Sequence, residues 1–119
     1  MGTAKDHVAP WRSVYKVHLL TDTDVTFLLT SGGHNAGIVS EPGHPGRSLQ
    51  VSTKDDTDRF MDPDTWATQT SKRDGSWWPE WIGWLNKRSG KPIKPRAMGA
   101  SDKGLGPLCD APGTYVHQD

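Results

Sequence analysis

The chain is short of the side chains that usually fill a protein core. Leucine, isoleucine, valine and phenylalanine together account for 20 of its 119 residues, below the share expected of a well-packed globular domain. The net charge is zero, so the high charge that accompanies intrinsic disorder is missing as well. Six tryptophans offset part of the deficit, because each can bury a large apolar area. We therefore expect one small domain with too few core residues to be stable by itself.

Further absences exclude whole classes of protein. Basic and acidic residues number 14 each, and the loose basic cluster at 87–96 is typical of a solvated helix end, so we expect no nucleic-acid partner. No apolar run approaches the length of a membrane span, and Lys5 and Asp6 fall where a signal peptide would be apolar. A single cysteine, Cys109, rules out an internal disulfide and favours a reducing cytosol.

Periodicity and capping residues predict three helices and one strand. The helices are expected at residues 11–20, after Pro10, at 64–73, after Asp62-Pro63, and from the cap Ser76 to Arg88. The strand covers residues 24–30 and is apolar enough at its centre to be buried on both faces. Residues 1–9 are expected to be a loop, and 49–52 are at most a short extended segment. The strand is therefore interpreted as part of a sheet that another piece of polypeptide completes.

A histidine follows the strand in a turn rich in glycine, SGGHNAG at 31–37. Reactive residues of α/β sheets lie just beyond the carboxyl ends of strands, and His34 lies four residues after Thr30. Asp6 comes earlier, before the first helix, which gives the order acid, helix, strand, histidine found at the end of α/β-hydrolase triads. In a triad the carboxylate fixes the imidazole tautomer. On these residues alone, a loop histidine that bonds the backbone and an aspartate that caps a turn remain alternatives.

The remaining chemistry-bearing residues suggest no other site. No pair of histidines has metal-ligand spacing with a third ligand nearby, so no metal is predicted. Trp78, Trp81 and Leu85 fall on one face of the third helix, with Trp77 and Trp84 beside it. Two interpretations of this face stay open: packing onto a sheet that this chain lacks, and an exposed aromatic surface that binds a polymer or a partner protein.

Four segments resemble, in order, the C-terminal end of polyhydroxyalkanoate synthases, most closely those of class I. They are KDHVAPWRSVY at 5–15, VTFLLTSGGHNAGIVSEPGH at 25–44, GSWWPEWIGWL at 75–85 and MGASDKGLGPLCDAPGTYV at 98–116. The resemblance implies an α/β fold: residues 1–90 are the C-terminal portion of an α/β-hydrolase-type catalytic domain, with a terminal strand, an active-site histidine loop and closing helices. Residues 91–119 form an irregular tail rich in proline and glycine.

The resemblance also implies a chemistry. Members of the family are cytosolic acyltransferases that polymerise (R)-3-hydroxyacyl-CoA into polyester granules and release coenzyme A, with no cofactor beyond the thioester substrate. Their D-H-x-x-P-W motif matches Asp6, and their S-G-G-H-N-A-G motif matches His34. His34 is then the general base that activates a cysteine thiol, and Asp6 orients it.

The family's G-x-C-x-G nucleophile elbow is missing from this sequence. Cys109 has no strand before it and no elbow around it, so we do not expect it to be the nucleophile. The chain is expected to be inactive alone and to act with an upstream portion that bears the cysteine, in the cytoplasm and in association with granules. A second synthase chain is a further partner. The alternatives are a non-catalytic module that binds granules or a synthase, and an inactive relic.

Overall fold

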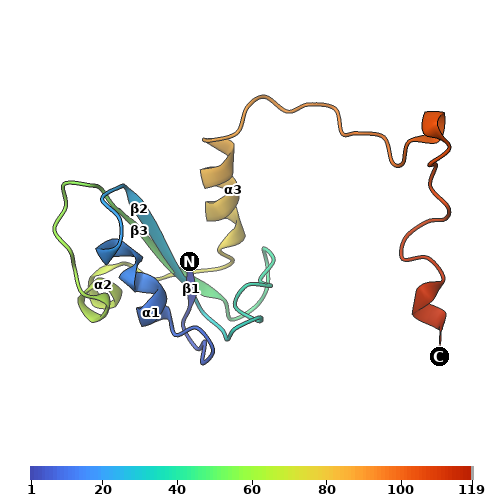
Figure 1. Ribbon diagram of the computed structural model, residues 1–119. Helices are drawn as coiled ribbons and strands as arrows, with labels where there is room; N and C mark the ends of the chain where they lie inside the picture. The colour runs from blue at the N-terminus through green and yellow to red at the C-terminus, as the bar shows by residue number, and fades with distance from the viewer. Residues whose placement is uncertain (119) are drawn as a thin grey trace. The chain divides into compact units, whose positions relative to one another are not determined.

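The computed structural model describes residues 1–118. Its internal contacts divide the chain into two units, Met1–Ser89 and Gly90–Asp119. The first unit contains a four-stranded sheet in the order β1-β2-β3-β4 together with three α-helices (Figure 1). The sheet is mixed, which agrees with the α/β class.

The strands of the sheet are short and centre on β2. They are β1 (Gly2–Thr3), β2 (Val25–Thr30), β3 (Ser48–Lys54) and β4 (Arg73–Asp74). β1 runs parallel to β2, with Thr3 opposite Thr30. β3 runs antiparallel to β2 from the pair Val25–Lys54 to the pair Thr30–Leu49, and β4 is antiparallel to β3.

The expectation that the strand at 24–30 lacks a partner in this chain is wrong. β3 pairs along the whole of β2, and β1, inside the segment expected to be a loop, pairs with its last two residues. β3 reads SLQVSTK, a mostly polar run that is only partly buried, so its apolar signal is weak. Within residues 1–118, β1 pairs only with Leu29 and Thr30 of β2, so Val25–Leu28 of β2 has no neighbouring strand on that side.

The three expected helices are present, each shorter than predicted. They are α1 (Trp11–Tyr15), continued by the 3₁₀ helix η1 (Lys16–Leu19), α2 (Pro63–Gln69) and α3 (Trp78–Asn86). Asp62 is the N-cap of α2, because its Oδ1 accepts hydrogen bonds from the backbone N–H groups of Asp64 (3.1 Å) and Thr65 (3.0 Å). α2 ends at Gln69, before the predicted Arg73, because the backbone is already extended at Thr70 (φ −79°, ψ 123°); Arg73 itself belongs to β4.

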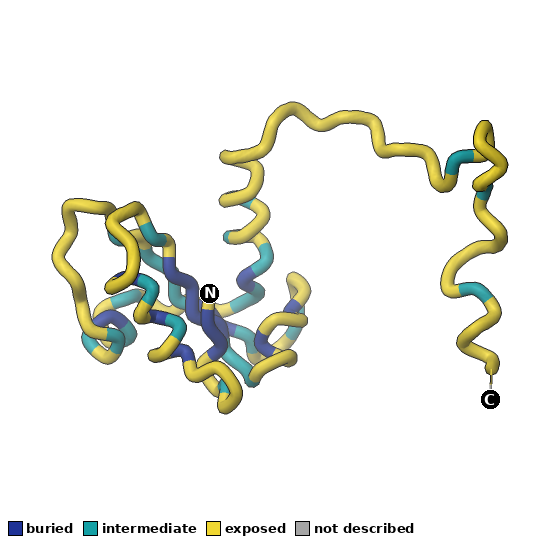
Figure 2. The backbone as a smooth tube through the Cα atoms, viewed as in Figure 1, coloured by how far each residue is buried: buried dark blue, intermediate teal, exposed yellow. Residues whose placement is uncertain are grey.

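Two apolar clusters pack against the sheet, and Figure 2 shows buried stretches of backbone at the centre of the first unit. Alternate residues of β2 point to opposite faces, so Phe27 and Leu29 pack with Trp11 and Tyr15 of α1 and with Trp66 of α2. On the other face, a second cluster consists of Leu28, Leu49 and Trp77, with Val51 and Trp78 partly buried against it.

Trp77, just before α3, and Trp78 pack against the chain's own sheet, not against a sheet that the chain lacks, as was expected of this face. Trp77 is buried in the second cluster, and its indole N–H donates to the backbone carbonyl of Ile38. Later in the helix, Trp81 and Trp84 remain 50% and 42% exposed. The face of α3 is thus divided between core and surface.

The second unit is largely exposed. It contains the 3₁₀ helices η2 (Ser101–Lys103) and η3 (Tyr115–His117) and an isolated bridge between Ala100 and Leu105. In the part of the chain that the structure describes, no helix has the length and apolar character needed to cross a membrane.

Candidate active site

Two parallel strands bring the predicted site residues to one edge of the sheet. Thr3 at the end of β1 lies opposite Thr30 at the end of β2, so the loops that follow leave the sheet at the same edge. Two backbone hydrogen bonds join the loops: Ala4 N–H donates to the Thr30 carbonyl, and Lys5 N–H to the Gly32 carbonyl, each at 2.8 Å. Asp6 and His34 follow directly in these loops.

Two glycines allow the His34 loop to fold back onto β1. Gly32 has a φ of +105°, in the left-handed region that favours glycine. Gly37 lies against Thr3, where a Cβ atom would approach the Thr3 Cγ2 to 2.6 Å. Between them the chain makes one helical turn, closed by a hydrogen bond of 2.9 Å from Gly37 N–H to the Gly33 carbonyl.

The side chains of Asp6 and His34 meet, as the sequence predicted they would. The His34 Nδ1 lies 2.9 Å from the Asp6 Oδ2, although the residues are 28 positions apart. Asp6 is itself held in place: its Oδ1 accepts from the backbone N–H groups of Val8 (2.8 Å) and Ala9 (2.9 Å). The Thr3 hydroxyl donates to its Oδ2 at 3.3 Å. The carboxylate is only 8% exposed, whereas the imidazole is 47% exposed.

The surroundings of Asp6 keep it ionised. The hydrogen bond from the Ala9 backbone, followed by that from His34, holds the pKa of the Asp6 carboxyl well below its usual range. An ionised carboxylate only accepts hydrogen bonds, so the His34 Nδ1 must carry the proton that it donates. In the neutral ring Nε2 then carries the lone pair. Within residues 1–118 no hydrogen bond to Nε2 is formed, so this nitrogen is available to accept a proton from a reacting group.

His44 and Cys109 are two further residues with reactive side chains. His44 pairs through Nδ1 with Glu41 at 3.5 Å, and Cys109 is an exposed free cysteine in the second unit. Thr3 was missed as a support for Asp6, because nothing in a single threonine near the start of a chain signals such a role. His18, in the segment predicted to be the first helix, is buried.

Comparison with known proteins identifies relatives along nearly the whole chain. Poly(3-hydroxyalkanoate) polymerase 2 of Ectopseudomonas oleovorans is 36% identical over 113 residues, which are 95% of this chain and 19% of that protein. Polymerase 1 of the same organism is 34% identical over 119 residues, 99% of this chain and 20% of that protein. The poly(3-hydroxyalkanoate) polymerase subunit PhaC of Cupriavidus necator is 33% identical over 118 residues, 97% of this chain and 19% of that subunit. No family model matches the chain.

The resemblance drawn from the sequence motifs is thereby confirmed, and its extent is defined. The chain matches these proteins over nearly all of its own length but covers only a small share of theirs. It is a relative of the poly(3-hydroxyalkanoate) polymerases that corresponds to about one fifth of their length.

Proposed function

We propose that this chain supplies the acid and the base of an acyl-transfer site of the polyhydroxyalkanoate synthase type, and that a separate stretch of polypeptide supplies the nucleophilic cysteine. The observation that carries the proposal is the hydrogen bond of 2.9 Å between the Asp6 carboxylate and the His34 Nδ1. It joins two loops at the carboxyl edge of parallel strands, where the active sites of α/β enzymes lie. The names of the relatives support a 3-hydroxyalkanoate as the unit that is polymerised, and the resemblance of the motifs supports its coenzyme A thioester as the substrate.

In the proposed reaction the His34 Nε2 accepts the proton of the cysteine thiol. The resulting thiolate attacks the thioester carbonyl of a 3-hydroxyacyl-CoA, and the proton on the imidazole passes to coenzyme A as it leaves. Asp6 holds Nδ1 in its protonated form and stabilises the positive charge that develops on the ring. A thiol has an unperturbed pKa of about 8.5, so a base in contact with it raises the supply of thiolate at neutral pH.

The proposal also concerns the type of domain to which the chain belongs, its location in the cell and its partners. Residues 1–90 act as the C-terminal portion of an α/β-hydrolase-type domain, with 91–119 as an irregular tail. The rest of the domain supplies the cysteine elbow and further strands. The chain works in the cytoplasm, where it associates with the growing polyester and with a second synthase chain. The parallel pairing of β1 with β2 supports the assignment of residues 1–90 to an α/β-hydrolase-type domain.

Reconstitution tests the proposal. The chain is combined with a separately produced upstream portion of one of the polymerases, and coenzyme A release from 3-hydroxybutyryl-CoA is followed with a thiol reagent. Neither part alone should release coenzyme A, and the mixture should. His34→Ala should lower the restored rate by about 10⁴-fold or more, because a triad acts as a unit.

Matched variants complete the design. His44→Ala removes an imidazole that pairs with Glu41, and Cys109→Ala removes the exposed thiol; both should leave the restored rate unchanged. Coenzyme A release by the lone chain that disappears in Cys109→Ala would overturn the assignment of the nucleophile. A complex that forms without restoring turnover would contradict the catalytic role and favour a binding module.

A further inference from the structure

Three consecutive side chains at the N-terminal end of α3 donate hydrogen bonds to the backbone of the loop at residues 31–40, which carries the predicted base. The indole N–H groups of Trp77 and Trp78 both donate to the Ile38 carbonyl oxygen, at 3.1 and 2.9 Å. The Ser76 hydroxyl donates to the carbonyl oxygen of Ser40. A carbonyl oxygen has two lone pairs, so the two indoles together use both acceptor sites of Ile38.

These hydrogen bonds hold a part of the loop that apolar side chains do not hold. The side chains of Ile38 and Val39 are both exposed, so their burial cannot fix the loop on the sheet. Ser40 is completely buried, and a buried carbonyl group that lost its partner would be costly. The end of the loop that follows the base is therefore fixed mainly through its backbone carbonyl groups.

The donors at residues 76–78 are themselves held in place. Trp77 is buried in the second cluster with Leu28 of β2 and Leu49 of β3, which joins its indole to the centre of the sheet. The Ser76 Oγ accepts from the backbone N–H of Trp78 at 3.0 Å, and this bond orients the hydroxyl. A support that is rigid in this way can fix the position of a functional loop.

One helical turn connects the held carbonyl of Ile38 with the base. The Ile38 N–H donates to the Asn35 carbonyl at 3.0 Å, and the Gly37 N–H donates to the Gly33 carbonyl at 2.9 Å. His34 lies between Gly33 and Asn35, inside this turn. A displacement of Ile38 would therefore move the backbone of His34 as well.

We propose that Ser76, Trp77 and Trp78 are positioning residues for His34, because their hydrogen bonds keep the loop in the conformation in which the imidazole meets Asp6. The Ser-Trp-Trp sequence then serves the site as well as the core. A displacement of about 1 Å in an active site can lower a rate about 10²-fold. This consequence for catalysis rests on the proposed function, whereas the anchoring of the loop does not.

Hydrogen exchange of the full chain, followed by NMR, tests the anchoring. Trp78→Phe keeps an aromatic ring and removes one indole N–H, and Ser76→Ala removes the hydroxyl. Each variant should speed the exchange of the Gly37 and Val39 amides about three- to ten-fold, as expected for the loss of one hydrogen bond. Ser76→Thr keeps the hydroxyl and should exchange at the wild-type rate.

The ring of His34 reports whether the anchoring reaches the site. In each of the two variants, Trp78→Phe and Ser76→Ala, the nitrogen-15 shifts of the two ring nitrogens should move toward each other. The reason is that a ring that is bound less firmly by Asp6 no longer holds a single tautomer. Loss of core packing alone would not produce this change.

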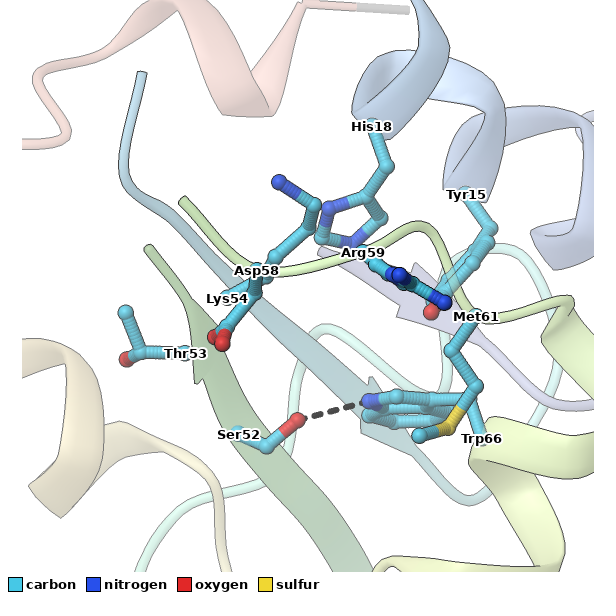
Figure 3. Close-up of a pocket in the computed structure, with 9 residues that line it drawn as sticks. All are labelled: Tyr15, His18, Ser52, Thr53, Lys54, Asp58, Arg59, Met61 and Trp66. Atoms are coloured by element: carbon cyan, nitrogen blue, oxygen red, sulfur yellow. Dashed lines mark hydrogen bonds between the residues drawn. The ribbon is translucent and has the colours of Figure 1, made fainter. Parts of the chain in front are cut away.

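Trp66→Phe is the matched control. It also removes an indole N–H that donates a hydrogen bond, to the Ser52 hydroxyl at 2.6 Å (Figure 3), but Trp66 belongs to the first cluster. This variant should lower the melting temperature and leave the loop amides and the His34 ring unchanged. Equal changes in Trp66→Phe and Trp78→Phe would overturn the positioning role.

The reconstituted enzyme tests the catalytic consequence. Trp78→Phe should lower kcat about ten-fold with little change in KM, because the base is displaced while the contacts of the substrate remain. Failure of reconstitution would count against the proposed function alone, since both NMR measurements use the chain by itself. Unchanged exchange and unchanged ring shifts in folded Trp78→Phe and Ser76→Ala would overturn the proposal, as would a loosened loop with an unchanged kcat.

Discussion

Gly37 lies where the His34 loop packs against β1, and replacing it with alanine should destabilise the first unit. The added Cβ would lie 2.6 Å from the Thr3 Cγ2 and 2.9 Å from both the Thr3 Cβ and the Gly33 carbonyl oxygen. All three contacts are too short to be accommodated without movement of β1 or of the loop. Overpacking of this kind costs about 1–3 kcal/mol.

Gly33 offers a matched control four residues away. A Cβ at Gly33 would meet only the Lys5 carbonyl oxygen, at 3.8 Å, and its φ lies outside the left-handed region. Gly33→Ala should therefore be neutral or stabilise by up to about 1 kcal/mol, because alanine reduces the freedom of the unfolded chain. The two variants differ by one methyl group in the same loop.

Thermal unfolding followed by circular dichroism distinguishes them. For a domain of this size, 1 kcal/mol corresponds to a change in Tm of about 4–8 °C, so Gly37→Ala should melt at least about 4 °C below the wild type and Gly33→Ala at or above it. Because β1 also positions Asp6, Gly37→Ala should disturb the His34 ring resonances as well. Equal melting temperatures for the two variants would refute the close packing of the loop on β1.

Three further predictions concern the core residue Trp66 and the two groups whose pKa values are lowered, His18 and Asp6. Trp66→Ala should cost about 3–5 kcal/mol in urea unfolding, because the indole contacts Trp11, Tyr15 and Phe27; a smaller loss than for Trp84→Ala would contradict the assigned core. Folding lowers the pKa of His18. The free energy of unfolding should therefore decrease as the pH falls below the unfolded pKa of about 6.5, because the unfolded chain then binds the proton more readily. His18→Phe should remove this dependence on pH. Folding also lowers the pKa of Asp6, so the stability that its carboxylate contributes is lost as the pH falls below about 4. Asp6→Asn should make the free energy of unfolding less dependent on pH in that range.

The sequence predicted those features whose causes lie close together in the chain. β2 is a compact apolar run, and Asp62 caps α2 through residues two and three positions later. Local patterns of this kind are readable without knowledge of the tertiary structure. The closeness of Asp6 and His34 is not local; it was predicted from the order of elements and from motifs that resemble those of the synthases.

The features that were missed depend on distant contacts. β3 is polar, and its strand conformation is fixed by pairing with β2. β1 is two residues long and carries no pattern of its own. His18 lines a pocket together with residues 52–54, 58, 59 and 61, which are more than 30 positions away in the chain. Propensity and periodicity contain no information about such contacts.

The tautomer of His34 tests the central claim most directly. Nitrogen-15 NMR of the ring, at a pH where it is neutral, distinguishes a protonated nitrogen from one with a lone pair. In the wild type Nδ1 should carry the proton and Nε2 the lone pair, because the Asp6 Oδ2 can only accept. In Asp6→Asn the amide oxygen is held by the Val8 and Ala9 N–H groups, so the amide NH₂ faces His34 and the proton should move to Nε2. A wild-type chain with the proton on Nε2, or an Asp6→Asn chain with an unchanged tautomer, would contradict the role of Asp6 in preparing His34 as a base.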